Sequence, residues 1–165
     1  MNITVRRSEE RDLPALLEIY NNEVLYSTAT FDLNPKTIEE RRIWFFEHNV
    51  GNHPLITAEY GGEVAGYASL SPYREKEAYK STVELSVYVA ERFRGKGIAS
   101  ALMEEILHLA REDDNTHTVI SVITEGNGAS VYLHEKFGFT YCGTMHDVGV
   151  KFGKYLNIVN FELRV

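Results

Sequence analysis

The chain has 165 residues, of which 44 % are hydrophobic and 25 % charged, and its formal net charge is −7. This balance is typical of one globular domain, here expected to span residues 1–165, and no apolar run approaches the roughly 18 residues that a membrane helix needs. The negative charge argues against a nucleic acid as partner, because binding to such polyanions depends on clustered lysine and arginine.

Two further observations bear on location and on metals. Residues 1–7 contain no apolar stretch of the signal-peptide type, so we expect a cytoplasmic protein with no membrane partner. Cys142 is the single cysteine, which excludes an intrachain disulfide and any cysteine-rich metal site, and we expect no metal. Because Cys142 falls in a predicted strand, we interpret it as a packing residue.

The first half of the chain is predicted to contain three strands and two helices. Residues 2–7 alternate apolar and polar side chains, which predicts a strand. A helix follows with Pro14 in its first turn, and a second helix is expected after Thr37, which begins a possible capping box. Residues 54–60 and 63–70 predict a hairpin joined by two glycines.

The second half is predicted to contain four strands and two helices. The strand at residues 81–90 alternates clearly, so Glu84, Ser86 and Tyr88 share its more polar face. The remaining predicted elements are a helix at 98–111, a strand at 118–123, a helix capped by Asn127 that stops at Gly138, and strands at 139–144 and 155–163. The order β-α-α-β-β-β-α-β-α-β-β predicts an α/β (α+β) fold with a mixed sheet and helices packed on it.

A basic, glycine-rich loop joins the strand at 81–90 to the helix that follows it. The loop reads Arg94-Gly95-Lys96-Gly97-Ile98-Ala99. Glycine lets the backbone adopt positive φ and approach a ligand closely, and a helix N-terminus offers unpaired N–H groups with partial positive charge. The loop therefore predicts a phosphate site, although a plain basic turn before a helix would have the same composition.

Two familiar phosphate-binding motifs fit this loop poorly. A Walker A loop requires Gly-Lys-Ser/Thr after a first glycine and four residues, and that pattern is absent. A Rossmann fingerprint would have a third glycine where the chain has Ser100, and the acidic residue expected about 20 positions later is missing, since Glu125 comes too late. Dinucleotide binding therefore stays a second choice.

Two segments resemble motifs of the GNAT acetyltransferases. The pattern Arg94-x-x-Gly97-x-Ala99 resembles their acetyl-CoA signature, and residues 127–139, which end in Gly138-Phe139, resemble their fourth-helix pattern. Because the two segments occur in order within a matching succession of strands and helices, the chain is identified as a member of this superfamily. The resemblance implies a central, mostly antiparallel sheet with helices on both faces.

Three segments resemble the phosphinothricin N-acetyltransferase family in particular. Residues 82–89 resemble its Thr-Val-Glu-His-Ser/Thr-Val-Tyr-Val strand, residues 134–135 its His-Glu step, and residues 148–157 its late Val-Gly-x-Lys-x-Gly-x-Trp-x-Asp segment. The family also suggests a homodimer. The chain departs from the family at Leu85, Tyr155 and Asn157, which replace histidine, tryptophan and aspartate.

The resemblance implies transfer of acetyl from acetyl-CoA, as cosubstrate, to the primary amine of a small amino-acid-like acceptor. An ammonium must lose a proton before it attacks, and Glu84 is the candidate base, against the alternative of an ordinary solvent-facing glutamate. His134 is the candidate acid for the leaving thiolate, against the alternative of a surface histidine bonded to a carbonyl. Tyr132 is interpreted as a packing residue.

The resemblance also implies a set of ligand contacts. The expected coenzyme contacts are Val87, Tyr88, Val89, Arg94, Gly95, Lys96, Gly97, Ile98, Ala99, Ser100, Asn127 and Lys136. The expected acceptor contacts are Phe31, Tyr73, Arg74, Tyr79, Glu84, Leu85 and Ser86, with Arg74 offering a bidentate fork for a carboxylate. A polyamine, an aminoglycoside or a protein amine on the same scaffold stays an alternative acceptor, and a non-catalytic acyl-CoA-binding module stays an alternative function.

Overall fold

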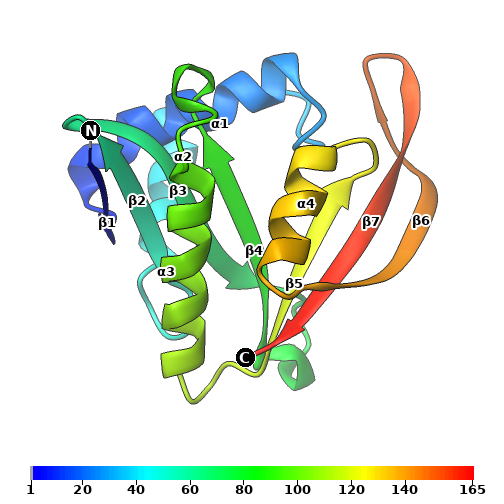
Figure 1. Ribbon diagram of the computed structural model, residues 1–165. Helices are drawn as coiled ribbons and strands as arrows, with labels where there is room; N and C mark the ends of the chain where they lie inside the picture. The colour runs from blue at the N-terminus through cyan, green and yellow to red at the C-terminus, as the bar shows by residue number, and fades with distance from the viewer. Residues whose placement is uncertain (1) are drawn as a thin grey trace.

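The computed structural model describes residues 2–165 and confirms the predicted order of strands and helices (Figure 1). The strands are β1 (Ile3–Arg7), β2 (Leu55–Tyr60), β3 (Glu63–Pro72), β4 (Thr82–Val89), β5 (Thr118–Thr124), β6 (Thr140–Lys151) and β7 (Lys154–Arg164). The helices are α1 (Leu13–Tyr26), α2 (Ile38–Phe46), α3 (Ile98–Glu112) and α4 (Gly128–Lys136), with short 3-10 turns at Glu10–Asp12, Glu77–Tyr79 and Glu91–Phe93.

The strands form one seven-stranded sheet in the order β1-β2-β3-β4-β5-β7-β6. Neighbouring strands run antiparallel except for β4 and β5, which run parallel. Helices cover both faces, with α3 and α4 on one side and α1 and α2 on the other (Figure 1). The expected mixed, mostly antiparallel sheet is therefore confirmed.

The helices form where the sequence supplies an apolar stripe and a start signal. The side chains of Leu102, Met103, Ile106 and Leu107 in α3 are fully buried against the sheet. The expected capping box at Thr37 is present, because its hydroxyl accepts a hydrogen bond from the Glu40 backbone N–H and the Glu40 carboxylate accepts one from the Thr37 backbone N–H.

The sheet opens between β4 and β5. Their parallel pairing covers only three positions, which match residues 82–84 with residues 118–120. On its other edge β4 stays paired with β3 up to Val89. In the described part of the chain, the β5-facing edge of β4 is thus unpaired beyond Glu84, and the two strands diverge toward their C-terminal ends (Figure 1).

Two packing predictions were wrong. Cys142 is exposed, because it lies where the register between the edge strand β6 and β7 shifts, between Tyr141 and Gly143, and the alternation of the sequence no longer reports burial there. Tyr132 is 70 % exposed, because α4 packs on the sheet through the side chain of His134 instead. Strand β6 is also longer than expected; a positive φ at Asp147 marks an irregular stretch that hides the strand pattern.

Candidate active site

A cavity of about 900 Å³ occupies the opening between β4 and β5. It is lined by the segment after α1 (residues 27–31), by the outer part of β4 (84–89), by the loop and first turn of α3, and by β5 and α4. This volume lies within the range of roughly 300–1,000 Å³ that is usual for small-molecule sites. The cavity therefore brings together segments that lie far apart in the sequence.

Most of the predicted coenzyme contacts line this cavity. The residues that do so are Val87, Tyr88, Val89, Arg94, Gly95, Gly97, Ile98, Ala99, Ser100 and Asn127. Lys96 and Lys136 are not part of the lining. The Lys96 ammonium lies 5.5 Å from the centre of the Tyr60 ring, while the Lys136 ammonium donates a hydrogen bond of 3.3 Å to the Ser100 hydroxyl. Lys136 thus lies beside the loop, outside the cavity.

The glycine loop has the backbone geometry that its sequence predicts. Gly95 and Gly97 adopt φ of 75° and 85°, a region that side-chain-bearing residues rarely occupy, and Gly97 is the residue before the first turn of α3. The N–H groups of that first turn have no helical partners, and the helix dipole adds partial positive charge. This geometry at the wall of the cavity is of the kind that suits an anion, and binding of a phosphate there stays a prediction.

Arg94 makes an ion pair that the sequence did not reveal. Its guanidinium donates to the Glu23 carboxylate over 2.6 Å, and Glu23 lies on α1 with its side chain almost buried. The Ser27 hydroxyl donates to the same carboxylate. One sequence signal was available, since Glu23 interrupts the core-facing stripe of α1 between Tyr20 and Val24. The pair connects the glycine loop to the segment that follows α1.

Glu84 lies in the outer part of β4, where its side chain lines the cavity and is half-buried. Burial raises the pKa of the Glu84 carboxyl above its ordinary value. A general base works best when its pKa lies near the operating pH, so this shift brings Glu84 closer to that condition than an exposed glutamate would be. The position and the pKa direction both agree with the predicted base.

His134 is a buried residue of the cavity wall, not a surface histidine. Its Nδ1 lies 2.7 Å from the Ser130 carbonyl oxygen, and its Nε2 lies 2.8 Å from the Ser121 hydroxyl. A carbonyl oxygen only accepts, so Nδ1 carries the proton and Nε2 accepts from Ser121 in the neutral ring. Burial lowers the pKa of His134 and favours that neutral form. Ser121, which also lines the cavity, was missed by sequence analysis.

Asn127 both caps α4 and lines the cavity. Its side-chain oxygen accepts a hydrogen bond of 3.3 Å from the backbone N–H of Ser130, which confirms the predicted cap of α4. The same residue lines the cavity. Its contact with a coenzyme stays a prediction.

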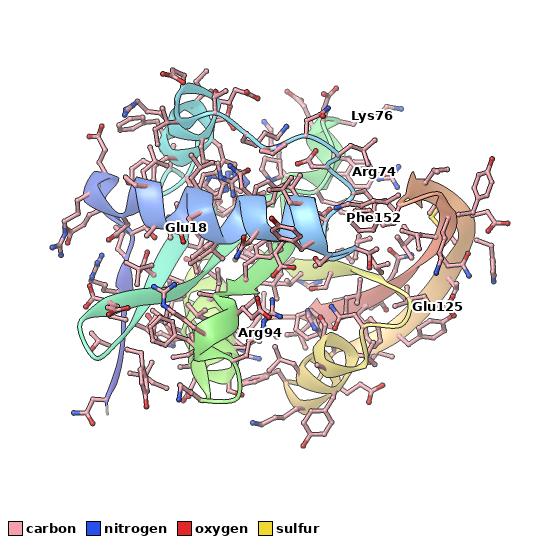
Figure 2. The ribbon with its side chains drawn as sticks, turned by 90° about the horizontal axis from the view of Figure 1, so that it is seen from above. Glu18, Arg74, Lys76, Arg94, Glu125 and Phe152 are labelled. Atoms are coloured by element: carbon pink, nitrogen blue, oxygen red, sulfur yellow. The ribbon has the colours of Figure 1, made fainter. Side chains whose placement is uncertain are left out.

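The predicted acceptor contacts fall into two groups. Phe31, Glu84, Leu85 and Ser86 line the cavity, although the Leu85 side chain also belongs to the hydrophobic core. The other three lie outside the lining, in a cluster of their own. There the Arg74 guanidinium lies 5.0 Å from the centre of the Tyr73 ring and 5.9 Å from that of Tyr79. In the view from above, Arg74 and Arg94 lie on opposite sides of α1 (Figure 2).

Asn157, one of the departures from the family pattern, has a structural partner. Its amide Nδ2 donates to the Glu125 carboxylate over 2.6 Å, and its Oδ1 accepts from the Asp147 backbone N–H over 2.7 Å. An aspartate at this position would place a second carboxylate beside Glu125. The asparagine is therefore matched to its local surroundings.

Two findings concern metals and membranes. Residues 2–165 contain no group of three or more His, Cys, Asp or Glu side chains arranged to hold a metal ion. In the same part of the chain, no helix has the length and apolar character that crossing a bilayer requires.

Comparison with known proteins identifies the family. A split sheet with a glycine loop at a helix N-terminus and a carboxylate in one cavity has the features of a coenzyme-dependent transferase. The model of the Acetyltransferase (GNAT) family matches residues 14–139, and the chain belongs to this family. It is therefore an N-acetyltransferase, as the sequence motifs predicted.

Curated relatives and solved structures show which named acetyltransferases the chain resembles. The chain is 42 % identical to a phosphinothricin N-acetyltransferase of Streptomyces coelicolor, over 97 % of this chain and 95 % of the relative. It is 36 % identical to an L-methionine sulfoximine/L-methionine sulfone acetyltransferase of Pseudomonas aeruginosa, over 100 % of this chain and 96 % of the relative. The crystal structure of a phosphinothricin acetyltransferase from Sinorhizobium meliloti in complex with acetyl-CoA is 31 % identical and superimposes with a TM-score of 0.94, covering 100 % of this chain and 89 % of that one.

Proposed function

We propose that this protein transfers acetyl from acetyl-CoA to the primary amine of a small amino-acid-like acceptor of the phosphinothricin, methionine sulfoximine or methionine sulfone type. The observation that carries this proposal is that Glu84 and the glycine loop at residues 95–100 line the same cavity. The names of the relatives supply the acceptor class, and the Sinorhizobium meliloti complex supplies the donor.

The proposed coenzyme site follows the opening of the sheet. The pyrophosphate would bind the N–H groups at residues 95–100, with Arg94 and Lys136 nearby. The pantetheine arm would run along the unpaired edge of β4 and take up the hydrogen bonds that β5 does not. Backbone N–H groups at residues 87–89 would stabilise the oxygen of the attacked thioester.

The proposed chemistry uses one base and one donor. Glu84 takes a proton from the acceptor's ammonium, directly or through a water, and the freed amine attacks the thioester carbonyl. The carbon–sulfur bond then breaks, and CoA leaves as a thiolate that takes up a proton. The Ser121 hydroxyl faces the cavity with His134 behind it. For this relay the His134 ring first takes up a proton at Nε2 and then donates it to the Ser121 oxygen, while the Ser121 hydroxyl gives its own proton to the thiolate.

The acceptor's carboxylate would be bound from the loop between β3 and β4. Arg74 has the bidentate geometry that a carboxylate favours, and Tyr73 and Tyr79 hold its guanidinium by cation–π contacts. Phe31 would form the opposite wall. Because this cluster lies outside the described cavity lining, the loop would contact an acceptor that extends beyond the cavity.

Three broader predictions accompany this function: a single domain, a cytoplasmic location and a homodimer. The hairpin formed by the edge strand β6, its neighbour β7 and the turn between them exposes several large apolar side chains, which supports self-association. These side chains are Tyr141, Met145, Val148, Val150, Phe152 and Tyr155. Sedimentation analysis of the purified protein tests the dimer.

The decisive experiment measures release of free CoA thiol from acetyl-CoA with a panel of amines. The panel contains phosphinothricin, methionine sulfoximine, methionine sulfone, a polyamine, an aminoglycoside and a peptide with a free amino terminus. We expect release with the first three. Release with a polyamine or aminoglycoside alone would contradict the acceptor class. Acetyl-CoA that binds but is never turned over would favour a non-catalytic module, and thermal protection by NAD in place of acetyl-CoA would overturn the donor.

A further inference from the structure

Gly149 lies directly beneath the Phe31 ring. A Cβ atom built on Gly149 would lie 2.3 Å from Cε2, 2.6 Å from Cδ2 and 3.0 Å from Cζ of Phe31. Real Cβ atoms essentially never approach other heavy atoms this closely. The ring therefore rests on bare backbone of β6, in a place that any side chain at this position would fill. Gly149 belongs to the late family segment at residues 148–157, to which sequence analysis assigned no role.

The backbone at Gly149 does not itself require glycine. Its φ lies outside the left-handed region that Gly95 and Gly97 occupy. Gly149 also pairs with Leu156 of β7 in the regular antiparallel register. The three atoms nearest to an added Cβ all belong to Phe31, so the glycine provides room for one aromatic ring.

Hydrogen bonds to backbone carbonyl groups hold the segment that carries Phe31 in place. The Thr124 hydroxyl donates to the carbonyl of Thr28 over 2.5 Å. The buried ammonium of Lys151 donates to the carbonyl of Thr30 over 2.8 Å and to that of Glu23 over 3.5 Å. These bonds attach the segment to β5 and β6 on both sides. The backbone cannot easily move away from β6, and a displacement at Gly149 must be taken up by the ring.

The Phe31 side chain also lines the cavity, as do Glu84 and Ser86. It lies between the cavity and the backbone of β6, so a ring pushed off Gly149 moves into the space where the acceptor would bind. The coenzyme loop at residues 95–100 belongs to a different wall and is not touched by this change.

We propose that Gly149 is a specificity-determining position, which sets the size of the acceptor site by letting Phe31 withdraw against β6, and that Lys151 is the positioning residue that holds the segment in place. This inference rests on the proposed function and adds a limit on the length of the acceptor's side chain. With glycine at 149 the site has room for an extended amino-acid side chain of the methionine sulfone kind. A larger residue at 149 restricts it to shorter amino acids.

The test is a double-mutant cycle of Gly149→Ala and Phe31→Ala, assayed with amino-acid acceptors of graded side-chain length. In Gly149→Ala we expect KM for the longest good acceptor to rise by roughly tenfold or more, a usual size for an overpacked site, with KM for acetyl-CoA unchanged. In the Phe31→Ala background the same substitution should have no effect on any acceptor. Val150→Ala, on the exposed neighbour, is the matched control.

Several outcomes would overturn the inference. One is an active Gly149→Ala enzyme with the wild-type acceptor profile, and another is an effect that persists without the Phe31 ring. A wild-type enzyme that releases no CoA with any amine contradicts the proposed function instead. In that case a crystal structure of Gly149→Ala still decides, since a ring left in place over a displaced β6 refutes the proposal. Should that variant fail to fold, Phe31→Ala alone must extend the acceptor range to longer side chains.

Discussion

At the proposed pyrophosphate end of the cavity the candidate binding groups belong to one short segment, residues 94–100, and they include the backbone N–H groups of the first turn of α3. At the acceptor end, the wall combines Phe31 with Glu84 and is supported by Gly149 of β6, three residues from distant parts of the chain. The first arrangement depends on φ angles and a helix N-terminus, and the second on which side chains the fold brings into contact.

From this difference we expect substitutions to change the acceptor more readily than the donor. A backbone site tolerates many substitutions around it as long as its glycines remain. A site made of packed side chains changes shape with a single methyl group, because protein interiors are close-packed. The following predictions separate the two ends, in order of decreasing effect.

Replacing Glu84 with glutamine should have the largest effect. We expect kcat to fall by roughly 10²- to 10⁴-fold, the usual contribution of a general base, while the affinity for acetyl-CoA is kept. In the wild type, activity should fall at acid pH as Glu84 protonates, at a pKa that burial raises above the ordinary glutamate value. Rates measured across pH check both points. Glu104→Gln on the exposed face of α3 is the control, and unchanged turnover in Glu84→Gln would remove Glu84 as base.

Gly97→Ala should weaken the binding of acetyl-CoA and leave the acceptor end of the cavity unchanged. An alanine at φ of 85° is strained by about 1–2 kcal/mol, and relief of that strain would misplace the first turn of α3. We expect the Kd for acetyl-CoA to rise by roughly tenfold, measured by calorimetry. Gly62→Ala provides a matched control, since Gly62 has φ of 84° in the turn between β2 and β3, with nothing near its side-chain position. Equal losses of affinity in both variants would contradict a direct role of the loop.

Ser121→Ala and His134→Phe should have a smaller effect on turnover. If the proton reaches the thiolate through the hydroxyl, both variants lose kcat by a similar, several-fold factor, because each interrupts the same pair. The comparison uses kcat at saturating acetyl-CoA. A wild-type rate in Ser121→Ala, alongside a reduced rate in His134→Phe, would show that the histidine acts without the hydroxyl.

The smallest expected effect concerns stability. Because burial raises the folded-state pKa of Glu84 above its unfolded value, its charged form destabilises the fold at neutral pH. Glu84→Gln should therefore unfold at a higher temperature than the wild type at pH 7. The gain should shrink as pH falls through the raised pKa toward the ordinary glutamate range. Thermal melts at several pH values measure it, and a gain that persists unchanged at low pH would refute this origin.

Sequence analysis predicted the backbone of the glycine loop and the cap of α4 better than the side-chain packing around Phe31 and Arg94. The positive φ of Gly95 and Gly97 and the cap by Asn127 are local properties, and each follows from residue type and spacing. The contacts of Arg94 with Glu23 and of Phe31 with Gly149 depend on tertiary packing; a local pattern can mark Glu23 as unusual on its helix, but it cannot name the partner of either residue. The same reason explains the wrong interpretations of Cys142 and Tyr132, whose burial depends on what covers β6 and α4.

The buried ammonium of Lys151 has a chemical consequence. Its nitrogen is bonded to two carbonyl oxygens, and the residue is only 3 % exposed, so an amine-reactive reagent reaches it only when the β6–β7 hairpin separates from the segment after α1. The rate at which Lys151 is labelled therefore measures how often the β6–β7 hairpin separates locally from the segment after α1. An enzyme that acylates amines keeps one of its own amines out of reach of acylating agents.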